Sequence, residues 1–159
     1  MLLEIRKYPD QILNKRAKKV DEIREEEKKL IKDMIETMYA YKGVGLAAPQ
    51  IGVSKRIVVV DVGKGPKIFI NPKIIKKTKE KEISEEGCLS VPGRFLKIKR
   101  YKEIIVKAQD ENGKKFEIKA DGLLSRCLQQ EIDHLNGILI FDRLGLFERL
   151  TKFFKRNKL

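Results

Sequence analysis

The chain has 159 residues, of which 42% are hydrophobic and 37% are charged, and its formal net charge is +13 at pH 7. This length and apolar content suit one domain with its own core and exclude a disordered tail. No apolar run is long enough to span a bilayer and no signal-peptide core follows Met1, so we expect a cytoplasmic protein without a membrane partner. The 36 basic against 23 acidic residues favour anionic partners such as RNA, although a solvated surface accounts for most of them.

Periodic patterns predict the elements of the first half of the chain. Apolar residues at helical spacing predict a helix over residues 22–41. Two β-branched runs, at residues 56–61 and 67–72, predict strands, the second of which is stopped by Pro72. Residues 85–93 are rich in glycine and other turn formers, so we expect a turn-rich segment there.

The second half of the chain alternates apolar and polar residues before it becomes helical again. Strands are expected at residues 95–100, 103–109 and 116–120, with a hairpin turn at Asp110-Glu111-Asn112-Gly113. A helix should then begin after an N-cap at Asp121 and end at Asn136-Gly137. Residues 144–158 predict a basic amphipathic helix. With neither repeat nor linker, the pattern indicates a single α+β domain over residues 1–159.

Gln130, Glu131 and His134 lie on one face of the predicted helix, because residues three and four apart share a face. A zinc-hydrolase helix reads H-E-x-x-H, with two imidazole ligands and a glutamate base, whereas this chain reads Q-E-x-x-H. Cys88, in a glycine-flanked turn, could add a thiolate to His134, and a bound metal would lower the pKa of water to about 7. Taken alone, the pattern also fits a buried helix that carries Glu and His by chance.

The two cysteines are too few for a disulfide framework. Either could be a thiolate ligand, but a single cysteine is more often a buried thiol. Cys127 lies about one turn before Gln130 and could face the same way; a core thiol is the better interpretation.

The segment at residues 43–50, G-V-G-L-A-A-P-Q, combines two glycines with small apolar residues and a proline. Such a loop lets the backbone approach another group closely. It lacks the third glycine and the preceding strand of a dinucleotide-binding fingerprint, which excludes that interpretation. A purely structural turn remains the alternative.

Three motifs occur in order along the chain, namely G-V-G-L-A-A-P-Q at residues 43–50, E-G-C-L-S at 86–90 and Q-E-I-D-H-L-N-G at 130–137. Together they resemble the signature motifs of the peptide deformylases, and the resemblance covers essentially the whole chain. It implies an α+β fold of antiparallel or mixed sheets packed around a central metal-binding helix, with further helices near both ends. It also implies a metal-dependent amidase that removes the N-formyl group from formyl-methionine of nascent polypeptides and releases formate.

The resemblance implies one divalent metal ion held by a cysteine and two histidines, with Fe²⁺ expected and Ni²⁺, Co²⁺ or Zn²⁺ as substitutes. The cysteine corresponds to Cys88, the second histidine to His134 and the first histidine position to Gln130. An amide oxygen is a weaker donor than imidazole for such metals. Three explanations stay open: a working enzyme with a glutamine ligand, an inactive relative that binds nascent peptide or ribosome, and a deliberate substitution.

The same resemblance assigns roles to other residues. Glu131 matches the general acid/base, while Gln50 and the backbone N–H of Leu89 match the groups that hold the formyl oxygen as it becomes an oxyanion. The loop that would bind the substrate peptide consists of Gly43, Val44 and Gly45, the backbone of Gly45 pairing with it. The expected partners are nascent formyl-Met polypeptides and the ribosome, reached through the basic helix at 144–158, but not DNA.

Overall fold

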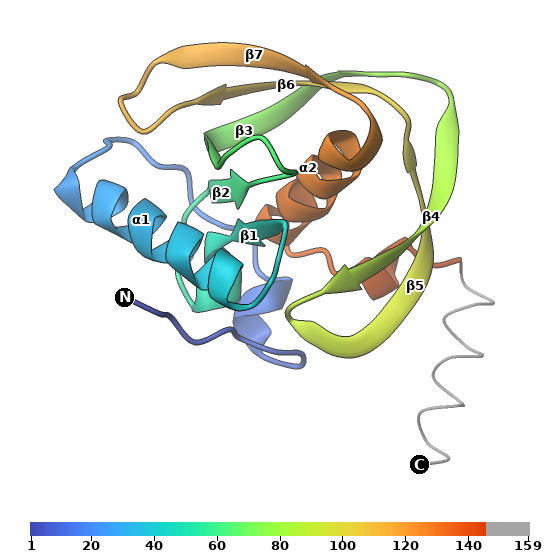
Figure 1. Ribbon diagram of the computed structural model, residues 1–159, viewed down its shortest axis with the longest axis horizontal. Helices are drawn as coiled ribbons and strands as arrows, with labels where there is room; N and C mark the ends of the chain where they lie inside the picture. The colour runs from blue at the N-terminus through green and yellow to red at the C-terminus, as the bar shows by residue number, and fades with distance from the viewer. Residues whose placement is uncertain (146–159) are drawn as a thin grey trace.

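The computed structural model describes residues 1–145 and consists of two antiparallel sheets, two α-helices and three short 3-10 helices (Figure 1). The helices are η1 (Gln11–Asn14), α1 (Glu25–Ala40), η2 (Ala48–Ile51), α2 (Gly122–Leu135) and η3 (Ile140–Arg143). The strands are β1 (Gly45–Ala47), β2 (Ile57–Val60), β3 (Lys67–Lys77), β4 (Lys81–Cys88), β5 (Val91–Tyr101), β6 (Ile104–Gln109) and β7 (Lys115–Ala120). This arrangement confirms the expected α+β class.

The larger sheet has the strand order β1-β2-β3-β6-β7, and β2 is buried on both of its faces. Val58 and Val60 pack into a core shared with α2, whereas Ile57 and Val59 pack into a second core shared with α1. Because side chains alternate along a strand, a run without polar residues is what a strand covered on both faces requires. The two helices lie on opposite sides of β2 in Figure 1.

Strand β3 continues past Pro72, so the expectation that the proline stops this strand is wrong. The pairing of β3 with β6 shifts register between Ile70 and Lys73, and Asn71 has a positive φ of 51°. Pro72 therefore falls in a bulge, where the missing backbone N–H costs no ladder hydrogen bond. The Asn71 amide stabilises the bulge, because it accepts from the Val20 N–H and donates to the Val20 carbonyl at 2.9 and 2.8 Å.

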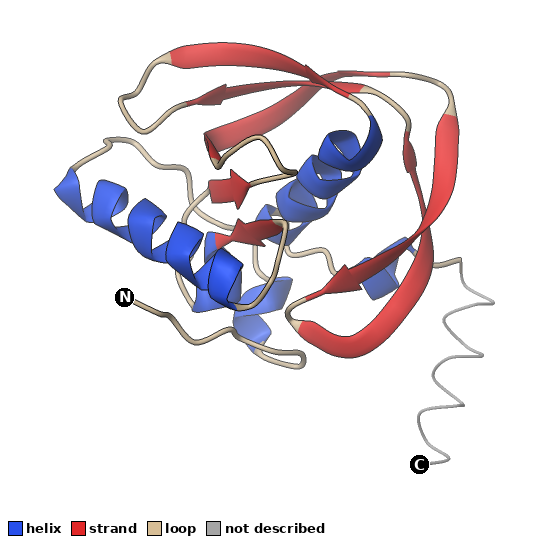
Figure 2. Cartoon of the chain, in the orientation of Figure 1, coloured by secondary structure: helices blue, strands red, loops and turns tan. Residues whose placement is uncertain are grey.

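Residues 85–93 are mostly strand, which corrects the expectation of a turn-rich segment. Cys88 ends β4 and pairs with Val91 of β5, so only Leu89 and Ser90 form the turn. The register shifts between Glu86 and Cys88, which leaves Gly87 at the irregularity. The two long strands form a separate sheet that curves around one end of α2 (Figure 2). The turn formers of the sequence thus mark a tight hairpin with an irregular register.

The predicted hairpin at Asp110-Glu111-Asn112-Gly113 is confirmed and joins β6 to β7. The helix expected after Asp121 is α2, with Asp121 at the N-cap position and Asn136 at the C-cap position. Gly137 has a positive φ of 74°, which a glycine adopts without strain. The helix expected over residues 22–41 is α1.

A chain of buried charges ties the small sheet to α2. Arg100 of β5 donates through Nε and Nη2 to the two Glu86 carboxylate oxygens at 2.9 Å each, and through Nη1 to Asp133 Oδ2 at 2.6 Å. Arg126 also donates to Glu86, and Arg143 of η3 donates to Asp133. Because each buried carboxylate contacts guanidinium groups, none of these charges is left uncompensated.

No helix within residues 1–145 has the length and apolar run that crossing a membrane requires. Apart from residues 144 and 145, the helix expected at residues 144–158 lies outside the described residues. A single domain over residues 1–159 stays a prediction.

We predict that Arg100→Met lowers the free energy of unfolding by about 3–5 kcal/mol, because it leaves Glu86 short of its bidentate partner inside the protein. Arg143→Met is the matched control, since the Arg143 side chain is 44% exposed and Asp133 keeps Arg100. This substitution should lower the free energy of unfolding by at most about 1 kcal/mol. Urea unfolding measures both changes, and equal losses in the two variants would contradict the prediction.

Candidate functional site

A cavity of about 540 Å³ opens between the loop before β1, the β4–β5 hairpin and α2. Its wall includes Gly43, Val44 and Gly45 on one side and Cys88 and Leu89 on another. Gln50, Gln130 and Glu131 also line the cavity. The three sequence motifs, which are far apart along the chain, therefore meet around one cavity.

Cys88 and His134 come from different elements and lie in contact. The Cys88 Sγ is 3.3 Å from the His134 Nε2, and the imidazole ring is buried. Burial, followed by the nearby Glu131 carboxyl group, raises the pKa of Cys88 to about 12. Burial also lowers the pKa of His134 to about 4, so the imidazole is neutral at pH 7. Burial therefore favours the uncharged form of both groups.

Glu131 lies on α2 at the wall of the same cavity and is 2% exposed. Its Oε2 atom has no hydrogen-bond partner within the described part of the chain. The pKa of Glu131 is raised to about 8, mainly by burial; the charge of Arg100 opposes this shift, and the Glu86 and Asp133 carboxylates contribute to it. A buried carboxyl group with a free oxygen is an unusual feature that points to chemistry rather than packing.

Gln50 is held with its amide nitrogen toward the hairpin. Its Oε1 accepts from the backbone N–H of Ala47 at 2.9 Å, which fixes the orientation of the amide. The Nε2 then donates to Ser90 Oγ at 3.2 Å and to Cys88 Sγ at 3.6 Å. Pro49 suits the first turn of η2, the helix that carries Gln50. The site thus has an oriented N–H donor beside the sulfur atom.

Gln130 is also oriented by its amide nitrogen. The Nε2 donates to Glu86 Oε1 at 3.0 Å and to the Gly87 carbonyl at 3.1 Å. Both partners accept only, so they select the nitrogen end of the amide. The amide oxygen of Gln130 takes part in neither bond.

Gly45 brings the β1 backbone against α2. A Cβ atom on Gly45 would lie 2.6 Å from Cys127 Sγ and 2.8 Å from Glu131 Oε1, closer than real contacts allow. Cys127 itself is buried in the core, as the sequence indicated, and its Sγ donates to the Val44 carbonyl. The absence of a side chain at Gly45 therefore sets the distance between the loop and Glu131.

Sequence reasoning missed the residues that support this cavity. Ser90 accepts the hydrogen bond of Gln50, and Glu86 accepts that of Gln130. Arg100 and Asp133 connect Glu86 to α2. Glu86 and Ser90 flank Cys88 and could have been found from that proximity, but nothing local marks Arg100 among the many basic residues of the chain.

The donors around the cavity fit a transition metal only if an amide oxygen takes part. Within residues 1–145, no three His, Cys, Asp or Glu side chains come together as a metal-ligand group. Cys88 and His134 are in contact and supply a sulfur and an imidazole nitrogen, which suit iron, nickel, cobalt or zinc rather than magnesium or calcium. Gln130, on the same helix as His134, lies at the cavity wall and can add an amide oxygen donor.

Comparisons with known proteins agree with this geometry. A sequence model of the family described as polypeptide deformylase matches residues 2–149. The peptide deformylase of Thermodesulfovibrio yellowstonii is 49% identical over 99% of both chains, and that of Dictyoglomus turgidum is 55% identical over 90% of this chain and 93% of its own. The crystal structure of the Thermotoga maritima peptide deformylase is 50% identical and aligns with a TM-score of 0.89 over 91% of this chain and 99% of its own.

A second solved structure covers nearly the whole chain. The peptide deformylase from Ehrlichia chaffeensis, in complex with actinonin, is 44% identical and aligns with a TM-score of 0.92 over 99% of this chain and 96% of its own. The fold is therefore that of a family of hydrolases. The chain belongs to the polypeptide deformylase family.

We predict that Gly45→Ala lowers the free energy of unfolding by about 1–3 kcal/mol, because its methyl group overpacks the space next to Cys127 and Glu131. Gly43→Ala is the control, since the nearest atom to its methyl group is the flexible end of Leu89 at 3.0 Å, and the next atoms lie at an ordinary contact distance of 3.5 Å. Denaturant unfolding of both variants tests the difference. A Gly45→Ala protein as stable as Gly43→Ala would show that β1 does not need this close approach.

Proposed function

We propose that this enzyme hydrolyses the N-formyl group from the formyl-methionine that begins nascent polypeptides, and that it releases formate. One observation carries the proposal, namely the buried Glu131 carboxyl group, whose free Oε2 lies at a cavity shared with the Cys88–His134 pair. The names of the relatives support the same reaction. They give no support to the alternative of an inactive relative.

A divalent metal ion would be held by the Cys88 sulfur, the His134 Nε2 and the amide oxygen of Gln130, with Fe²⁺ expected and Ni²⁺, Co²⁺ or Zn²⁺ as substitutes. The ion supplies a Lewis acid and a water molecule of lowered pKa when it is bound. The 3.3 Å contact between Sγ and Nε2 supports this assignment, because two ligands of one ion must lie side by side. A cation would also offset the burial that keeps the Cys88 thiol protonated.

The hydrogen bonds of Gln130 support its assignment as a metal ligand. A glutamine binds a metal ion only through its oxygen, because the amide NH₂ group is a donor of hydrogen bonds. Glu86 and Gly87 accept from the Gln130 nitrogen, and this leaves the oxygen available. Glu86 would therefore act as a positioning residue that prevents the amide from turning its nitrogen toward the ion.

The chain's own groups would divide the remaining work. The Gln50 Nε2 and the backbone N–H of Leu89 would donate to the formyl oxygen as it gains negative charge. With a bound cation to offset the burial that raises its pKa, Glu131 would be ionised. It would then take a proton from the attacking water on Oε2 and give it to the departing amine. The tight fit of Gly45 against Glu131 keeps that carboxyl group in place.

The substrate peptide would add to β1 as a further strand. β1 is an edge strand of its sheet, and the loop residues Gly43, Val44 and Gly45 line the cavity beside it. An extended peptide at such an edge gains backbone hydrogen bonds whatever its sequence, which suits an enzyme that acts on many chains. The apolar part of the lining, including Tyr41 and Val91, would receive the methionine side chain.

This function places the enzyme in the cytoplasm, where nascent polypeptides are made. Docking to the ribosome through the basic helix predicted at 144–158 remains part of the proposal, and these residues lie almost entirely outside the described range. We also retain the interpretation of residues 1–159 as one domain. No DNA partner is proposed.

We predict that Glu131→Gln lowers kcat for formate release from a formyl-Met dipeptide by about 100-fold or more, because the amide cannot carry the proton. The assay is run anaerobically with protein loaded with Fe²⁺ or Ni²⁺. Glu117→Gln removes an exposed carboxyl group of β7 and should leave kcat unchanged. If neither the natural chain nor its Gln130→His variant releases formate, the proposed function is wrong.

A second prediction concerns the metal itself and is read without turnover. Gln130→His should raise the affinity for Co²⁺ by about tenfold or more, because imidazole is the better donor, and Gln130→Leu should lower it by a similar factor. Competition with a chromophoric chelator gives the dissociation constant of Co²⁺ for each variant and for the unchanged chain. Should Gln130→Leu bind Co²⁺ as tightly as the natural chain, the amide oxygen is not a ligand.

A further inference from the structure

Two clefts that share no lining residue with the catalytic cavity are lined by clusters of basic residues. The first, of about 570 Å³, lies between the segment before α1, the start of β2, the β3 bulge and the end of α2, and we call it the arginine cleft. The second, of about 300 Å³, lies between β3, the β4–β5 sheet and α2, and we call it the lysine cleft. Ile74 lines both, so the two clefts adjoin.

The arginine cleft holds four cations and no carboxylate in its lining, the cations being Arg16, Lys19, Arg56 and Lys73. Arg56 is the recessed member, and its guanidinium donates to the Leu135 carbonyl at 2.9 Å and to Asn136 Oδ1 at 3.0 Å. Its pKa is lowered by burial and then by the charge of Arg16. The guanidinium is thus fixed by neutral acceptors, and no carboxylate among the described residues compensates its charge.

The lysine cleft is lined by Lys76, Lys77, Lys81 and Lys99, none of which forms a salt bridge with a residue of the described range. The Nζ atoms of Lys77 and Lys81 each lie 4.6 Å from the centre of the Tyr101 ring. The single carboxylate of the lining, Asp133, is already bound by Arg100 and Arg143. Two ammonium groups gathered on one aromatic ring form a cationic centre that lacks an anion.

The shape of this surface indicates what kind of anion it fits. Eight cations spread over two adjoining clefts exceed what one phosphate group can contact, so the ligand must carry a row of charges. A flat lipid surface would meet the protruding lysines but would not reach the recessed Arg56. A flexible phosphodiester chain can follow a bent groove, and an aromatic ring such as Tyr101 in a basic groove suits its bases.

We propose that the arginine and lysine clefts together form a docking track for single-stranded RNA, bound through its phosphates. The choice of RNA as the source of the phosphates rests on the proposed function, because ribosomes present nascent polypeptides within an RNA-rich particle. The track comprises described residues only and is separate from the basic helix predicted at 144–158. It gives a role to part of the net charge of +13 that catalysis does not use.

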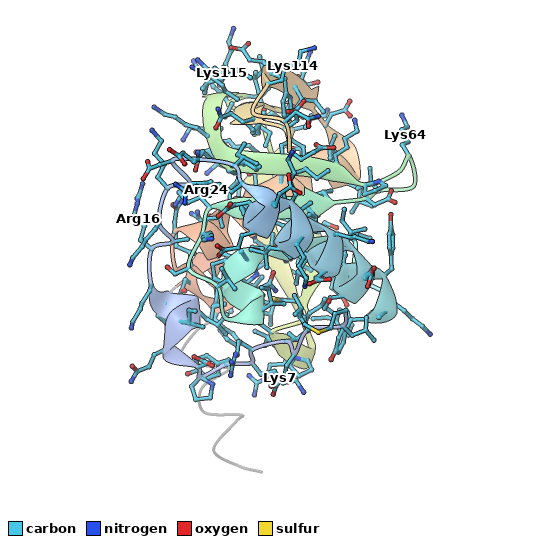
Figure 3. The ribbon with its side chains drawn as sticks, turned by 90° about the vertical axis from the view of Figure 1, so that its left-hand side faces the viewer. Lys7, Arg16, Arg24, Lys64, Lys114 and Lys115 are labelled. Carbon is cyan, nitrogen blue, oxygen red and sulfur yellow. The ribbon has the colours of Figure 1, made fainter. Side chains whose placement is uncertain are left out.

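The test compares two double variants of the full chain that change the net charge equally. Lys73→Glu with Lys76→Glu reverses one cation in each cleft, while Lys114→Glu with Lys115→Glu reverses two on the β6–β7 hairpin. Figure 3 shows Lys114 and Lys115 at one extremity of the molecule, well away from Arg16 of the arginine cleft. All four lysines are exposed, so neither variant disturbs the core.

Binding is measured by fluorescence anisotropy of a labelled oligouridylate at several salt concentrations. The cleft variant should bind about tenfold more weakly or worse. Its plot of log Kobs against log salt should also become less steep, by about 0.7 for each phosphate that it no longer neutralises. The hairpin variant should stay within about threefold of the natural chain, because only its long-range attraction is weakened. Equal weakening of both variants, or no weakening of either, would overturn the track.

Two further measurements separate the alternatives. Vesicles rich in anionic lipid are tested with the same proteins, and binding to vesicles but not to RNA would overturn the proposal in favour of a membrane surface. Formate release from a free formyl-Met dipeptide should be unchanged in both variants. Lack of that activity in both the unchanged chain and its Gln130→His variant would refute the proposed function, while the RNA comparison would still decide the track.

Discussion

The buried ion pairs of Arg100 with Glu86 and Asp133 are the constraint on which the site depends. Cys88 ends a strand of the small sheet and His134 belongs to α2, so their contact needs these two elements to be held together. A bidentate guanidinium contact is rigid and directional, unlike apolar packing. Since Gln130 shares the Glu86 carboxylate, the same contact also orients the third candidate ligand.

Burial acts on this cavity in a second way, by keeping its titratable groups neutral. The pKa of Cys88 and Glu131 is raised and that of His134 is lowered, each mainly because charge is costly where water is excluded. In this site burial outweighs the effect of the charges nearby. The ion chain nearby is the opposite case, because every carboxylate in it faces a guanidinium.

Two contrasting electrostatic environments therefore characterise the described part of the molecule. Inside the catalytic cavity, burial keeps the titratable side chains neutral, and an electrostatic interaction is strong there. Outside, the arginine and lysine clefts hold cations in water, where attraction acts over about a Debye length and falls with salt. The first arrangement suits chemistry on one bond, and the second suits attachment to a large polyanion.

The sequence by itself determined the elements with regular patterns, such as α1, the β-branched strand β2 and the Asn-Gly hairpin, because periodicity and turn preference act locally. It also determined the motifs that meet at the cavity. It did not determine that β3 crosses Pro72, since a bulge exists only against a partner strand. Nor did it reveal Arg100 as the residue that joins Glu86 to Asp133, or the Gln130 amide turned by Glu86. Those features are contacts between segments distant in the chain, so only the tertiary structure, which sets the distances between them, could decide them.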